Sequence, residues 1–541
     1  MVYGLSPAHR PRVFLTSLLQ RSAHAHPDQI ALVDGASRWR YADLWHATAG
    51  LAAQMQAQAG LRRGDRVAVW LEARAETVVA CLAGAQAGAA FVPVHAGLKP
   101  QQVLHVLSDA QPALLITSRA RYAQLSAAGL RAGSLPVWCV DDADWLQRLT
   151  PMAPPTGPLL DGDLAAILYT SGSTGRPKGV VLSHRNMVAG ALSVASYLGN
   201  TADDTLLAVL PLSFDAGFSQ LTTAFSVGAK VVLMNYLLPR DVLKAIDEHQ
   251  VTGLTAVPPL YIQLTQAKWP QATGAHGEEG AQASGRSLRY FANTGGRMPR
   301  ATLDALRQRW PQAKPFLMYG LTEAFRSTYL PPDQVDQRPD SIGKAIPNAE
   351  VLVLREDGTE CAADEPGELV HRGPLVAQGY WNDPEKTAER FRPLPAGLRA
   401  PGLVLPEIAV FSGDTVRRDA EGFLYFVGRR DEMIKTSGYR VSPTEVEEVL
   451  YATGLVGECA AFGVEHASLG QAIQVVATPP AGADVLDTDA LLAQCRQRLP
   501  AYMVPAGVHA AAGSLPRNPN GKIDRKRLAS DWAGSAARST T

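Results

Sequence analysis

Hydroxyl-bearing side chains, glycines and a lysine crowd into one short stretch of the chain, residues 170–179. Four hydroxyl groups within five positions can donate hydrogen bonds to an anion, and the glycines let the backbone turn its N–H groups the same way. Lys178 adds a mobile positive charge. This combination predicts a loop that holds phosphate groups. The residues concerned are Thr170, Ser171, Gly172, Ser173, Thr174, Gly175 and Lys178.

The neighbours of this loop decide between a phosphate site and a flexible surface segment, which is the more usual meaning of such a composition. The apolar run at 164–168 is typical of a buried strand, and a helix-like stretch follows Lys178. Anion sites form where a strand leads through a loop into a helix. Because Gly179 follows the lysine, the loop lacks the hydroxyl that holds Mg²⁺ in the common nucleotide loop. A different phosphate chemistry is therefore predicted.

The elements that must position this loop alternate between strand-like apolar runs and helical segments. This alternation predicts a mostly parallel α/β fold. After about residue 345, short alternating strands with glycine turns predict an antiparallel β module. We expect a helix at 41–60 and strands at 66–73, 113–117, 165–168, 206–212, 230–234 and 254–257.

The composition favours no charged partner. The chain has 541 residues with 51 basic and 51 acidic side chains, so no overall field attracts nucleic acid or an anionic membrane. The five cysteines form no CxxC or Cys/His cluster and are expected to be reduced core residues. No stretch suits a secretory leader or approaches the roughly 20 apolar residues that span a bilayer. We expect a cytoplasmic protein whose partners are small molecules or one protein surface.

Four further motifs follow the loop in order. They are YGLTE at 319–323, FSGD at 411–414, GRRDEMIKTSGYR at 428–440 and LPRNPNGKIDR at 515–525. Together with the loop they resemble the adenylate-forming superfamily of AMP-forming acyl-CoA synthetases, peptide-synthetase adenylation domains and luciferases, over nearly the whole chain. Members join a carboxylate to ATP, release pyrophosphate and hand the acyl group to a thiol. The resemblance implies ATP and Mg²⁺ as cofactors.

The resemblance also implies which residues hold the triphosphate. Thr170, Ser171 and Lys178 would embrace the β- and γ-phosphates, and Thr322 would donate to the α-phosphate. Glu323 would hold Mg²⁺, a hard ion that suits a carboxylate. This set supplies the cations and donors that a negatively charged α-phosphate needs when a carboxylate approaches it.

The nucleoside is assigned to a second group of residues by the same resemblance. Asp414 would accept hydrogen bonds from both ribose hydroxyls, which a carboxylate can do at once. Arg429 would reinforce the ribose or phosphate side. Gly295, Gly296 and Tyr319 match the adenine slot, although each of the three taken singly fits a turn or a core position.

Lys522 is the sharpest single assignment. A lysine in a Pro/Asn/Gly loop is usually solvated, but in the family's PNGK pattern it reaches the α-phosphate and carboxylate oxygens during adenylation. Asp431 matches the hinge about which a C-terminal cap rotates after adenylation. Lys435 and Gly438 would lie on the cap face that then meets the thiol, where the glycine leaves room for a pantetheine arm. The alternative is an exposed turn.

This hinge completes the predicted organisation. The expected fold class is α/β, with a large N-terminal adenylation domain at 1–430 made of parallel α/β subdomains and the β module. A small, mobile α+β cap would occupy 431–530, a size adequate for an independent fold. The tail at 531–541 lacks apolar periodicity and is expected to be disordered.

Two charged residues stand out in the acyl pocket that the resemblance implies. Asp215 aligns with the carboxylate that binds the substrate's α-ammonium in amino-acid-activating domains, and an isolated buried charge has little use in a fatty-acyl or aryl activator. Arg326 offers a planar fork for a second carboxylate, or else pairs with Asp215. The nine positions are Asp215, Ala216, Ser219, Leu260, Ala292, Thr294, Met318, Arg326 and Ser327.

We therefore expect activation of an amino acid with an additional carboxylate, followed by transfer to the pantetheine thiol of CoA or of a carrier protein. Residues 211–243 look most like acyl-CoA ligases associated with bacterial exosortase systems, a group that tends to accompany a pyridoxal-phosphate decarboxylase and a carrier protein. The alternatives are an acyl-CoA synthetase for a non-amino organic acid, a luciferase-like enzyme and a catalytically silent nucleotide-binding relative.

Overall fold

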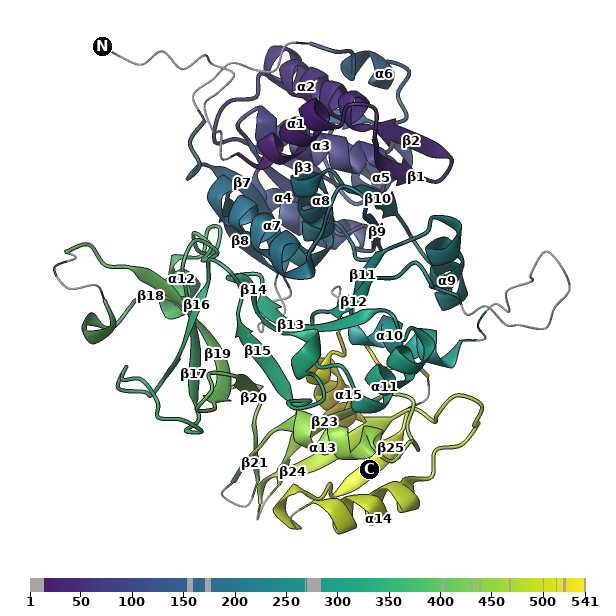
Figure 1. Cartoon of the computed structure of the whole chain (residues 1–541), viewed down its shortest axis with the longest axis vertical. Coiled ribbons are helices and arrows are strands. Elements are labelled where there is room, and N and C mark those ends of the chain that lie inside the picture. Colours follow the sequence, from purple (N-terminus) through teal and green to yellow (C-terminus); the bar gives the residue numbers. More distant parts are fainter. Residues whose placement is uncertain are drawn as a thin grey trace, which may run out of the picture.

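The structure is a computed structural model, and it places three sheets along one chain (Figure 1). Helices pack beside the six-stranded sheet and the parallel part of the largest sheet, and the third sheet forms a separate layer with the C-terminal helices. It describes residues 14–152, 159–170, 177–267, 269, 284–399, 402, 404–429, 432–436, 439–466, 469–499, 501–511, 513–518 and 522–539.

The first sheet contains six strands in the order β6-β5-β3-β4-β7-β8, parallel except for its last pair. Its central strands are continuously apolar and buried, as a sheet covered on both faces requires. The strands are β3 (Arg66–Val69), β4 (Ala90–Pro93), β5 (Leu114–Thr117), β6 (Val137–Cys139), β7 (Leu164–Thr170) and β8 (Lys178–Ser183). The helices of this region are α2 (Tyr41–Gln58), α3 (Ala75–Gln86), α4 (Pro100–Ala110), α5 (Arg119–Ala127) and α6 (Trp145–Arg148).

The predicted passage from the phosphate loop straight into a helix is wrong. β8 pairs antiparallel with β7, so the loop joins two strands of a hairpin. The reason is the run GVVLS, because adjacent valines favour a buried strand over a helix. Helix α7 (His184–Leu198) begins only after Ser183, whose hydroxyl accepts a hydrogen bond from the Asn186 N–H as an N-cap.

The second sheet begins as a parallel α/β layer, which confirms the predicted strand and helix alternation. Its strands are β1 (Ile30–Asp34), β2 (Ser37–Arg40), β9 (Thr205–Ala208), β10 (Lys230–Leu233), β11 (Gly253–Ala256), β12 (Tyr290–Asn293) and β13 (Lys314–Leu321). The helices are α1 (Leu15–Ala25), α7, α8 (Asp215–Val227), α9 (Pro239–Glu248), α10 (Pro258–Gln266) and α11 (Arg300–Arg309). The carboxyl ends of β11, β12 and β13 point to the same edge, where ligands bind in α/β sheets.

The same sheet continues as the predicted antiparallel β module. The register makes β14 the link between the two parts, since it pairs with β13 on one side and β15 on the other. The elements are β14 (Phe325–Leu330), β15 (Ser341–Ala345), β16 (Glu350–Leu354), β17 (Gly367–Arg372), α12 (Pro384–Arg390), β18 (Phe391–Pro393), β19 (Ile408–Arg418), β20 (Leu424–Arg429) and the short 3-10 turns η2 (Pro332–Gln334) and η3 (Ala396–Leu398).

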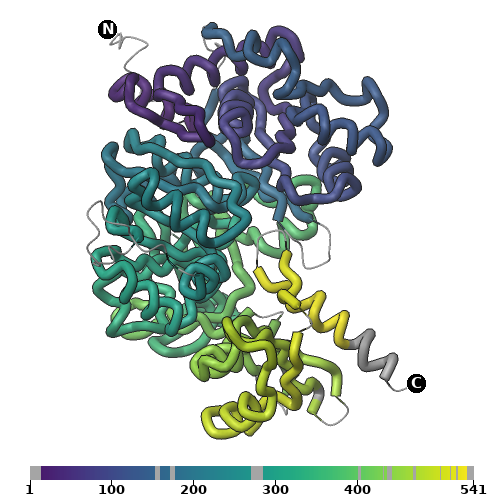
Figure 2. The backbone as a smooth tube through the Cα atoms, turned by 90° about the vertical axis from the view of Figure 1, so that its right-hand side faces the viewer, coloured from purple at the N-terminus to yellow at the C-terminus, as the bar shows by residue number. Residues whose placement is uncertain are grey.

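The C-terminal region is a small α+β unit with its own apolar core. In Figure 2 its yellow-green chain lies at the bottom of the molecule, below the large domain. Its elements are β21 (Ile434–Thr436), β22 (Tyr439–Val441), α13 (Pro443–Tyr451), β23 (Cys459–His466), β24 (Gly470–Ala477), α14 (Thr488–Arg498), η4 (Ala501–Met503), β25 (Gly507–Ala510) and α15 (Arg525–Ser539). This arrangement confirms the predicted fold class.

The predicted disordered tail differs from the structure, because helix α15 continues to Ser539. Leu528 and Trp532 are four residues apart and so share one helix face. Both pack against the edge of the small sheet, and the Trp532 ring lies 4.0 Å from that of His509. These two apolar contacts, about one helical turn apart, stabilise a helix whose sequence shows no longer apolar periodicity.

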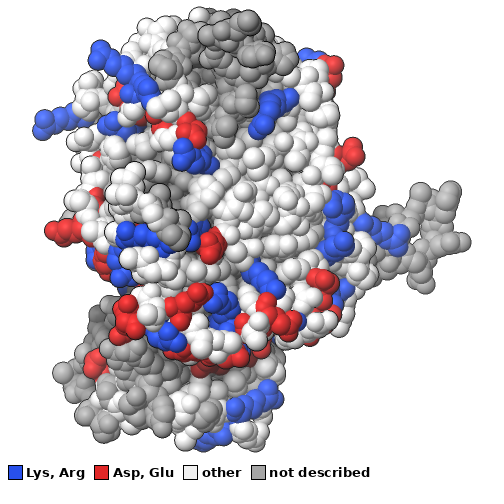
Figure 3. Space-filling model, turned by 60° about the vertical axis from the view of Figure 1, so that its left-hand side comes forward, with Lys and Arg blue, Asp and Glu red and all other residues white. Residues whose placement is uncertain are grey.

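Two composition-based expectations can be followed into the structure. All five cysteines are buried and free. On the face in Figure 3, basic and acidic side chains are interspersed, as the formal charge of zero suggests. Within the described ranges, no helix is both long and apolar enough to cross a membrane.

Candidate active site

The phosphate loop is closed at its base by the ladder between β7 and β8. Thr170 lies opposite Lys178 in this antiparallel register. The hairpin thus brings one hydroxyl and one ammonium together on neighbouring strands. The other predicted residues of the loop lie outside the described residues, namely Ser171, Gly172, Ser173, Thr174 and Gly175.

Lys178 belongs to a cluster of positive charges. Burial lowers the pKa of Lys178, and the nearby Lys386 and Arg390 lower it further, whereas Glu323 opposes the shift. The Lys178 ammonium lies 5.2 Å from the centre of the Tyr380 ring, a cation–π contact. Lys386 and Arg390 of α12 were not predicted from the sequence, because charges on a short helix usually mark a solvated face. Three cations in one place suit a polyphosphate.

Glu323 lies in the tight turn between β13 and β14 and is held from the other side by a strap, residues 377–381. The Tyr380 hydroxyl donates to Glu323 Oε1 at 2.6 Å, and the Ala377 N–H donates to the Glu323 carbonyl oxygen at 2.9 Å. The strap also accepts a hydrogen bond from the Val181 N–H of β8 at 3.0 Å. The predicted metal carboxylate and the strand after the phosphate loop are therefore tied together.

A carboxylate and a guanidinium face each other across β19 and β20. Asp414 is paired with Arg429 in the register, and Asp414 Oδ1 lies 3.2 Å from Arg429 Nε. The Tyr319 hydroxyl donates to Asp414 Oδ2. Burial raises the pKa of Asp414 above its usual value, while Arg429, Tyr319 and Lys522 act against this. The residue predicted to bind ribose is thus nearly buried and surrounded by donors and cations.

Lys522 reaches from the C-terminal unit to the predicted adenine glycines. Hydrogen bonds between Lys522 and Asn518, at 2.9 and 3.1 Å, close the turn that carries it. Gly295 has a φ of +77°, which favours glycine, and a methyl group there would lie 3.4 Å from Lys522 Cε, so the lysine side chain runs close to this turn. Desolvation lowers the pKa of Lys522 and the charge of Arg429 lowers it further, whereas Asp414 and Asp215 oppose this shift.

The turn after these glycines also holds the C-terminal unit. The Gly296 carbonyl accepts a hydrogen bond from Asn293 Nδ2 at 2.8 Å, which fixes the turn. Arg297, the next residue, forms ion pairs with Glu448 of α13 and with Asp340 of the large domain. One guanidinium therefore joins the two domains beside the predicted adenine slot.

Other predicted positions stay predictions. Asp431 and Gly438 lie outside the described residues. Lys435 belongs to β21, where its backbone pairs with that of β22. Thr322 precedes Glu323 in the β13–β14 turn and is partly exposed, so a ligand can reach it.

The predicted acyl pocket residues come from the start of α8 and from the sheet edge beside it. Asp215 is the first residue of α8, and only it among the nine is not fully buried. Ala292 and Met318 lie on the parallel strands β12 and β13, and Leu260 lies in the first turn of helix α10. The eight buried positions are Ala216, Ser219, Leu260, Ala292, Thr294, Met318, Arg326 and Ser327.

Asp215 and Arg326 act on each other electrostatically, yet no ion pair within 4.0 Å joins these two described residues. Arg326 is 2% exposed, and its guanidinium donates to Ser219 Oγ and to the Ala216 carbonyl, both at 3.0 Å. Its Nε has no hydrogen-bond partner. Burial raises the pKa of Asp215, while Arg326 and Lys522 oppose the rise.

Phe325 lines a small cavity beside Asp215, a position that was not predicted from the sequence. Its backbone adopts a φ of +57°, a strained value for an aromatic residue. A methyl group at Gly190 would lie 2.7 Å from the Phe325 ring, so the ring packs directly on the backbone of α7. Phe325, Asp215 and Ser219 line a cavity of about 20 Å³, which has room for one water. A positive φ at phenylalanine has no signal in the sequence.

These features together define the class of protein. Two α/β sheets converge on a cluster of cations and acids, and a small α+β domain delivers a lysine to the same place. This is the architecture of adenylate-forming ligases, which activate a carboxylate with ATP.

The family follows from sequence. The model of the AMP-binding enzyme family matches residues 19–381, and that of the AMP-binding enzyme C-terminal domain matches residues 445–522. The chain belongs to the AMP-binding enzyme family and is an AMP-forming acid–thiol ligase.

Characterised relatives span both kinds of thiol acceptor. A 2-succinylbenzoate–CoA ligase of Bacillus velezensis is 32% identical, with 94% of this chain and 96% of the relative covered. An L-proline–[L-prolyl-carrier protein] ligase of Streptomyces coelicolor is also 32% identical, with 87% and 88% covered. The structure of o-succinylbenzoate coenzyme A synthetase from Bacillus subtilis with ATP and magnesium has a TM-score of 0.78 and 28% identity, with 94% and 98% covered. The similarity to exosortase-associated ligases stays a prediction.

Proposed function

We propose that this ligase activates an amino acid that carries a second carboxylate, as an acyl-adenylate, and transfers it to the pantetheine thiol of CoA or of a carrier protein. The observation that supports the proposal is a pair of opposite charges, Asp215 and Arg326, that lie near each other without forming an ion pair. Both are residues of the predicted acyl pocket. Each charge then needs a partner that the substrate can supply.

The carboxylate of Asp215 needs a positively charged partner. Its carboxylate stands where burial raises its pKa, so ionisation at neutral pH is costly unless a positive group lies close by. A substrate ammonium next to Asp215 supplies that group. Lys522 and Arg326 contribute part of the compensation in its absence.

The guanidinium of Arg326 needs a negatively charged partner. The guanidinium is buried and donates to two neutral acceptors, Ser219 Oγ and the Ala216 carbonyl, and its Nε has no hydrogen-bond partner. The aromatic side chains of Phe325 and Tyr197 beside it bring no negative charge. A buried charge without a counter-charge costs several kcal/mol. A side-chain carboxylate of the substrate would take up the free donor and neutralise the charge in one step.

The remaining residues suit the adenylation step. A carboxylate oxygen of the acid forms a bond to the α-phosphorus of ATP, and the bond to the pyrophosphate oxygen breaks. Lys522 would neutralise charge on the α-phosphate, and Lys178 with Lys386 and Arg390 would receive the departing pyrophosphate. Glu323 would hold Mg²⁺, because this ion prefers carboxylate oxygens as ligands and the carboxylate lies next to the cations proposed to bind the phosphates. The ion would neutralise part of the phosphate charge.

Thioester formation is the second step of the proposal. The thiol sulfur of the pantetheine arm forms a bond to the acyl carbon of the adenylate, and AMP leaves with the electron pair of the acyl–oxygen bond. The face that would carry the thiol includes the predicted residues Lys435 and Gly438.

Lys522→Ala tests the chemistry. We expect carboxylate-dependent pyrophosphate release to fall by at least about 100- to 1,000-fold, the usual effect of removing one transition-state donor. Thioester formation from supplied acyl-AMP should stay near that of the wild type. Lys526→Ala, which removes an exposed lysine four residues further on, is the control. An equal loss in both steps would contradict the assigned role.

Arg326→Ala tests the substrate class. A screen of pyrophosphate release would use aspartate, glutamate, diaminopimelate, their β-amino relatives and matched monocarboxylic acids. For the wild type we expect dicarboxylic amino acids to be preferred. The variant should lose about 10- to 150-fold with these and far less with monocarboxylic acids, since a hydrogen bond to a charged group is worth about 1.5–3 kcal/mol. Equal losses would refute the role of Arg326.

A further inference from the structure

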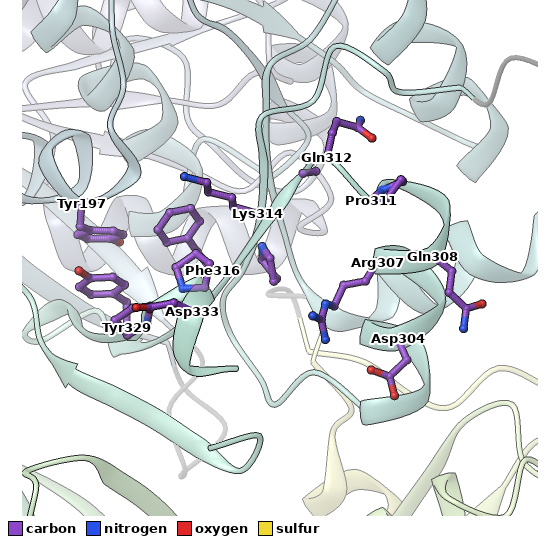
Figure 4. A pocket seen from close by; sticks show the side chains of 14 residues that line it. Tyr197, Asp304, Arg307, Gln308, Pro311, Gln312, Lys314, Phe316, Tyr329 and Asp333 are labelled. Carbon is purple, nitrogen blue, oxygen red and sulfur yellow. The ribbon is translucent and has the colours of Figure 1, made fainter. Parts of the chain in front are cut away.

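A wide surface groove lies behind the acyl pocket, between α11 and the hairpin of β13 and β14. It encloses about 1080 Å³. Figure 4 shows the stacked rings of Tyr197 and Tyr329 on one side, Phe316 next to them, and the polar residues of α11 on the other side. None of these groove residues belongs to the predicted acyl pocket.

The floor of this groove leads towards the acyl pocket along one face of the hairpin. Side chains two apart on a strand share a face, so Phe316, Met318 and the position of Gly320 lie in a row on β13. The register sets Tyr329 opposite Met318 and, past a bulge, Arg326 opposite Gly320. The groove and the pocket are therefore neighbours on the same face of the sheet, with Met318 between them.

Tyr197 stands at the boundary of the two spaces. Its ring stacks on Tyr329, with 4.3 Å between centroids and 13° between planes, and it lines the groove. Its hydroxyl points the other way and donates to Met318 Sδ at 2.8 Å. Arg326 is close enough to oppose the rise that burial causes in the pKa of Tyr197. One side of this residue faces solvent, and the other faces two acyl pocket residues.

We infer that Tyr197 is the end wall of the acyl pocket, and that it limits this ligase to acids with a short side chain by separating Arg326 and Met318 from the outer groove. The inference rests on the proposed acyl pocket. A longer acid would contact the Tyr197 ring. This ring is stacked on Tyr329, so it cannot move aside without losing the stacking contact. Removal of the ring joins the pocket to the groove.

The test uses Tyr197→Ala, Tyr197→Phe and the control Tyr122→Ala, which makes the same truncation on α5. Pyrophosphate release is measured for the best wild-type acid and for homologues lengthened by one to four methylenes. We expect Tyr197→Ala to raise the ratio of kcat/KM for the longer acids to that for the parent acid about tenfold or more, because one methylene in a pocket already discriminates by about that factor. Tyr197→Phe keeps the ring and should keep the wild-type ratio.

A second measurement needs no substrate. Met318→Cys is treated with a maleimide, alone and combined with Tyr197→Ala, against a background of buried native cysteines. We expect the double variant to react about tenfold faster or more. Equal labelling rates, or an unchanged length ratio in a variant that still binds AMP, would overturn the end-wall role. If the best wild-type acid lacks an ammonium or a second carboxylate, the proposed substrate class fails, and the length ratio still decides the role of Tyr197.

Discussion

At the level of single residues, the site is governed by two carboxylates that burial disfavours. The pKa values of Asp215 and Asp414 are both raised by desolvation, and in both cases cations from other elements act against the rise. Asp414 has Arg429 beside it. Asp215 has only the more distant charges of Arg326 and Lys522, so it is the less compensated of the two and the one whose partner the substrate is expected to bring.

Asp215→Asn is predicted to stabilise the protein and to impair activation of amino acids. A raised pKa in the folded state means that ionisation costs stability, so the wild type loses stability as pH rises through the folded pKa and the asparagine variant does not. Its thermal midpoint should exceed that of the wild type at about pH 7.5, and the gain should shrink towards about pH 4.5. Activity with amino acids should fall about 10- to 150-fold.

The control for this experiment is Asp203→Asn, which changes an exposed aspartate. Surface changes of this kind usually stay within about 0.5 kcal/mol. If Asp215→Asn had the same thermal midpoint as the wild type at every pH, the carboxylate would be compensated within the protein, and the need for a substrate ammonium would disappear.

Tyr380→Phe is predicted to weaken the response to Mg²⁺. The lost hydroxyl donates to Glu323 Oε1 at 2.6 Å and orients the carboxylate that is proposed to hold the ion. Groups that orient a metal ligand typically affect metal affinity 10- to 100-fold. We expect the Mg²⁺ concentration for half-maximal pyrophosphate release to rise about tenfold or more, with a smaller change in kcat at saturation.

Tyr425→Phe is a matched control, because the Tyr425 hydroxyl also donates to a carboxylate, that of Asp419, at 3.0 Å. Tyr425 lies on β20, outside the cluster of Lys178, Lys386 and Arg390, so its substitution should leave the Mg²⁺ dependence unchanged. A wild-type Mg²⁺ curve for Tyr380→Phe would show that the hydroxyl has no part in metal binding.

At the level of elements, helix α8 sets the position of the acyl pocket through a close backbone contact. A methyl group at Gly217 would lie 1.9 Å from the Pro211 carbonyl oxygen, so the helix start sits directly on the preceding loop. This contact aims Asp215 and Ala216 at the sheet edge. No side chain fits at this position, because even a methyl group would overlap the backbone of Pro211.

Gly217→Ala is predicted to destabilise the protein, although alanine is the better helix former. The propensity gain is about 1 kcal/mol, and overpacking against a backbone atom costs about 1–3 kcal/mol or more. Gly84→Ala in α3 is the matched control, since its nearest contact would be 3.5 Å and only the gain remains. Thermal unfolding should show opposite shifts for the two variants. A stabilised Gly217→Ala protein would mean that the loop yields freely.

At the level of the whole molecule, the orientation of the C-terminal domain brings Lys522 to the site. Arg297 bridges Glu448 of that domain and Asp340 of the large domain. The two side chains of the interdomain pair are 37% and 38% exposed, which places the pair among those worth about 0.2–1 kcal/mol. So small a contribution would not prevent the rotation that is predicted for this domain between the two half-reactions.

Glu448→Gln is predicted to slow adenylation about 2- to 5-fold, the change in rate that corresponds to the free energy of such an ion pair. Thioester formation from supplied acyl-AMP should not change. The difference from the wild type should fade at high salt, because salt screens a partly exposed pair. Glu465→Gln, an exposed change on β23 of the same domain, is the control. Equal slowing of both half-reactions would show that the pair does not select the adenylation orientation.

Much of the fold was predictable, and less of the site. Strand and helix alternation follows from local apolar periodicity, so the α/β class and the antiparallel module were predicted correctly. The phosphate hairpin was mistaken for a strand and helix because the short run after Lys178 allowed both. Tyr380 and Arg390 were missed because their role depends on contacts with Glu323 and Lys178, which are far away in the sequence.

The sequence by itself determined the reaction class, because the order of its phosphate, carboxylate and lysine motifs is a linear property that needs no coordinates. Only the tertiary structure decided that Lys522 stands beside Gly295, that Asp215 and Arg326 form no ion pair, and that Tyr197 contacts both Met318 and Tyr329. The physical reason is that these relations depend on distances between elements more than a hundred residues apart. Such distances are set by packing and domain orientation, and local periodicity carries no information about them.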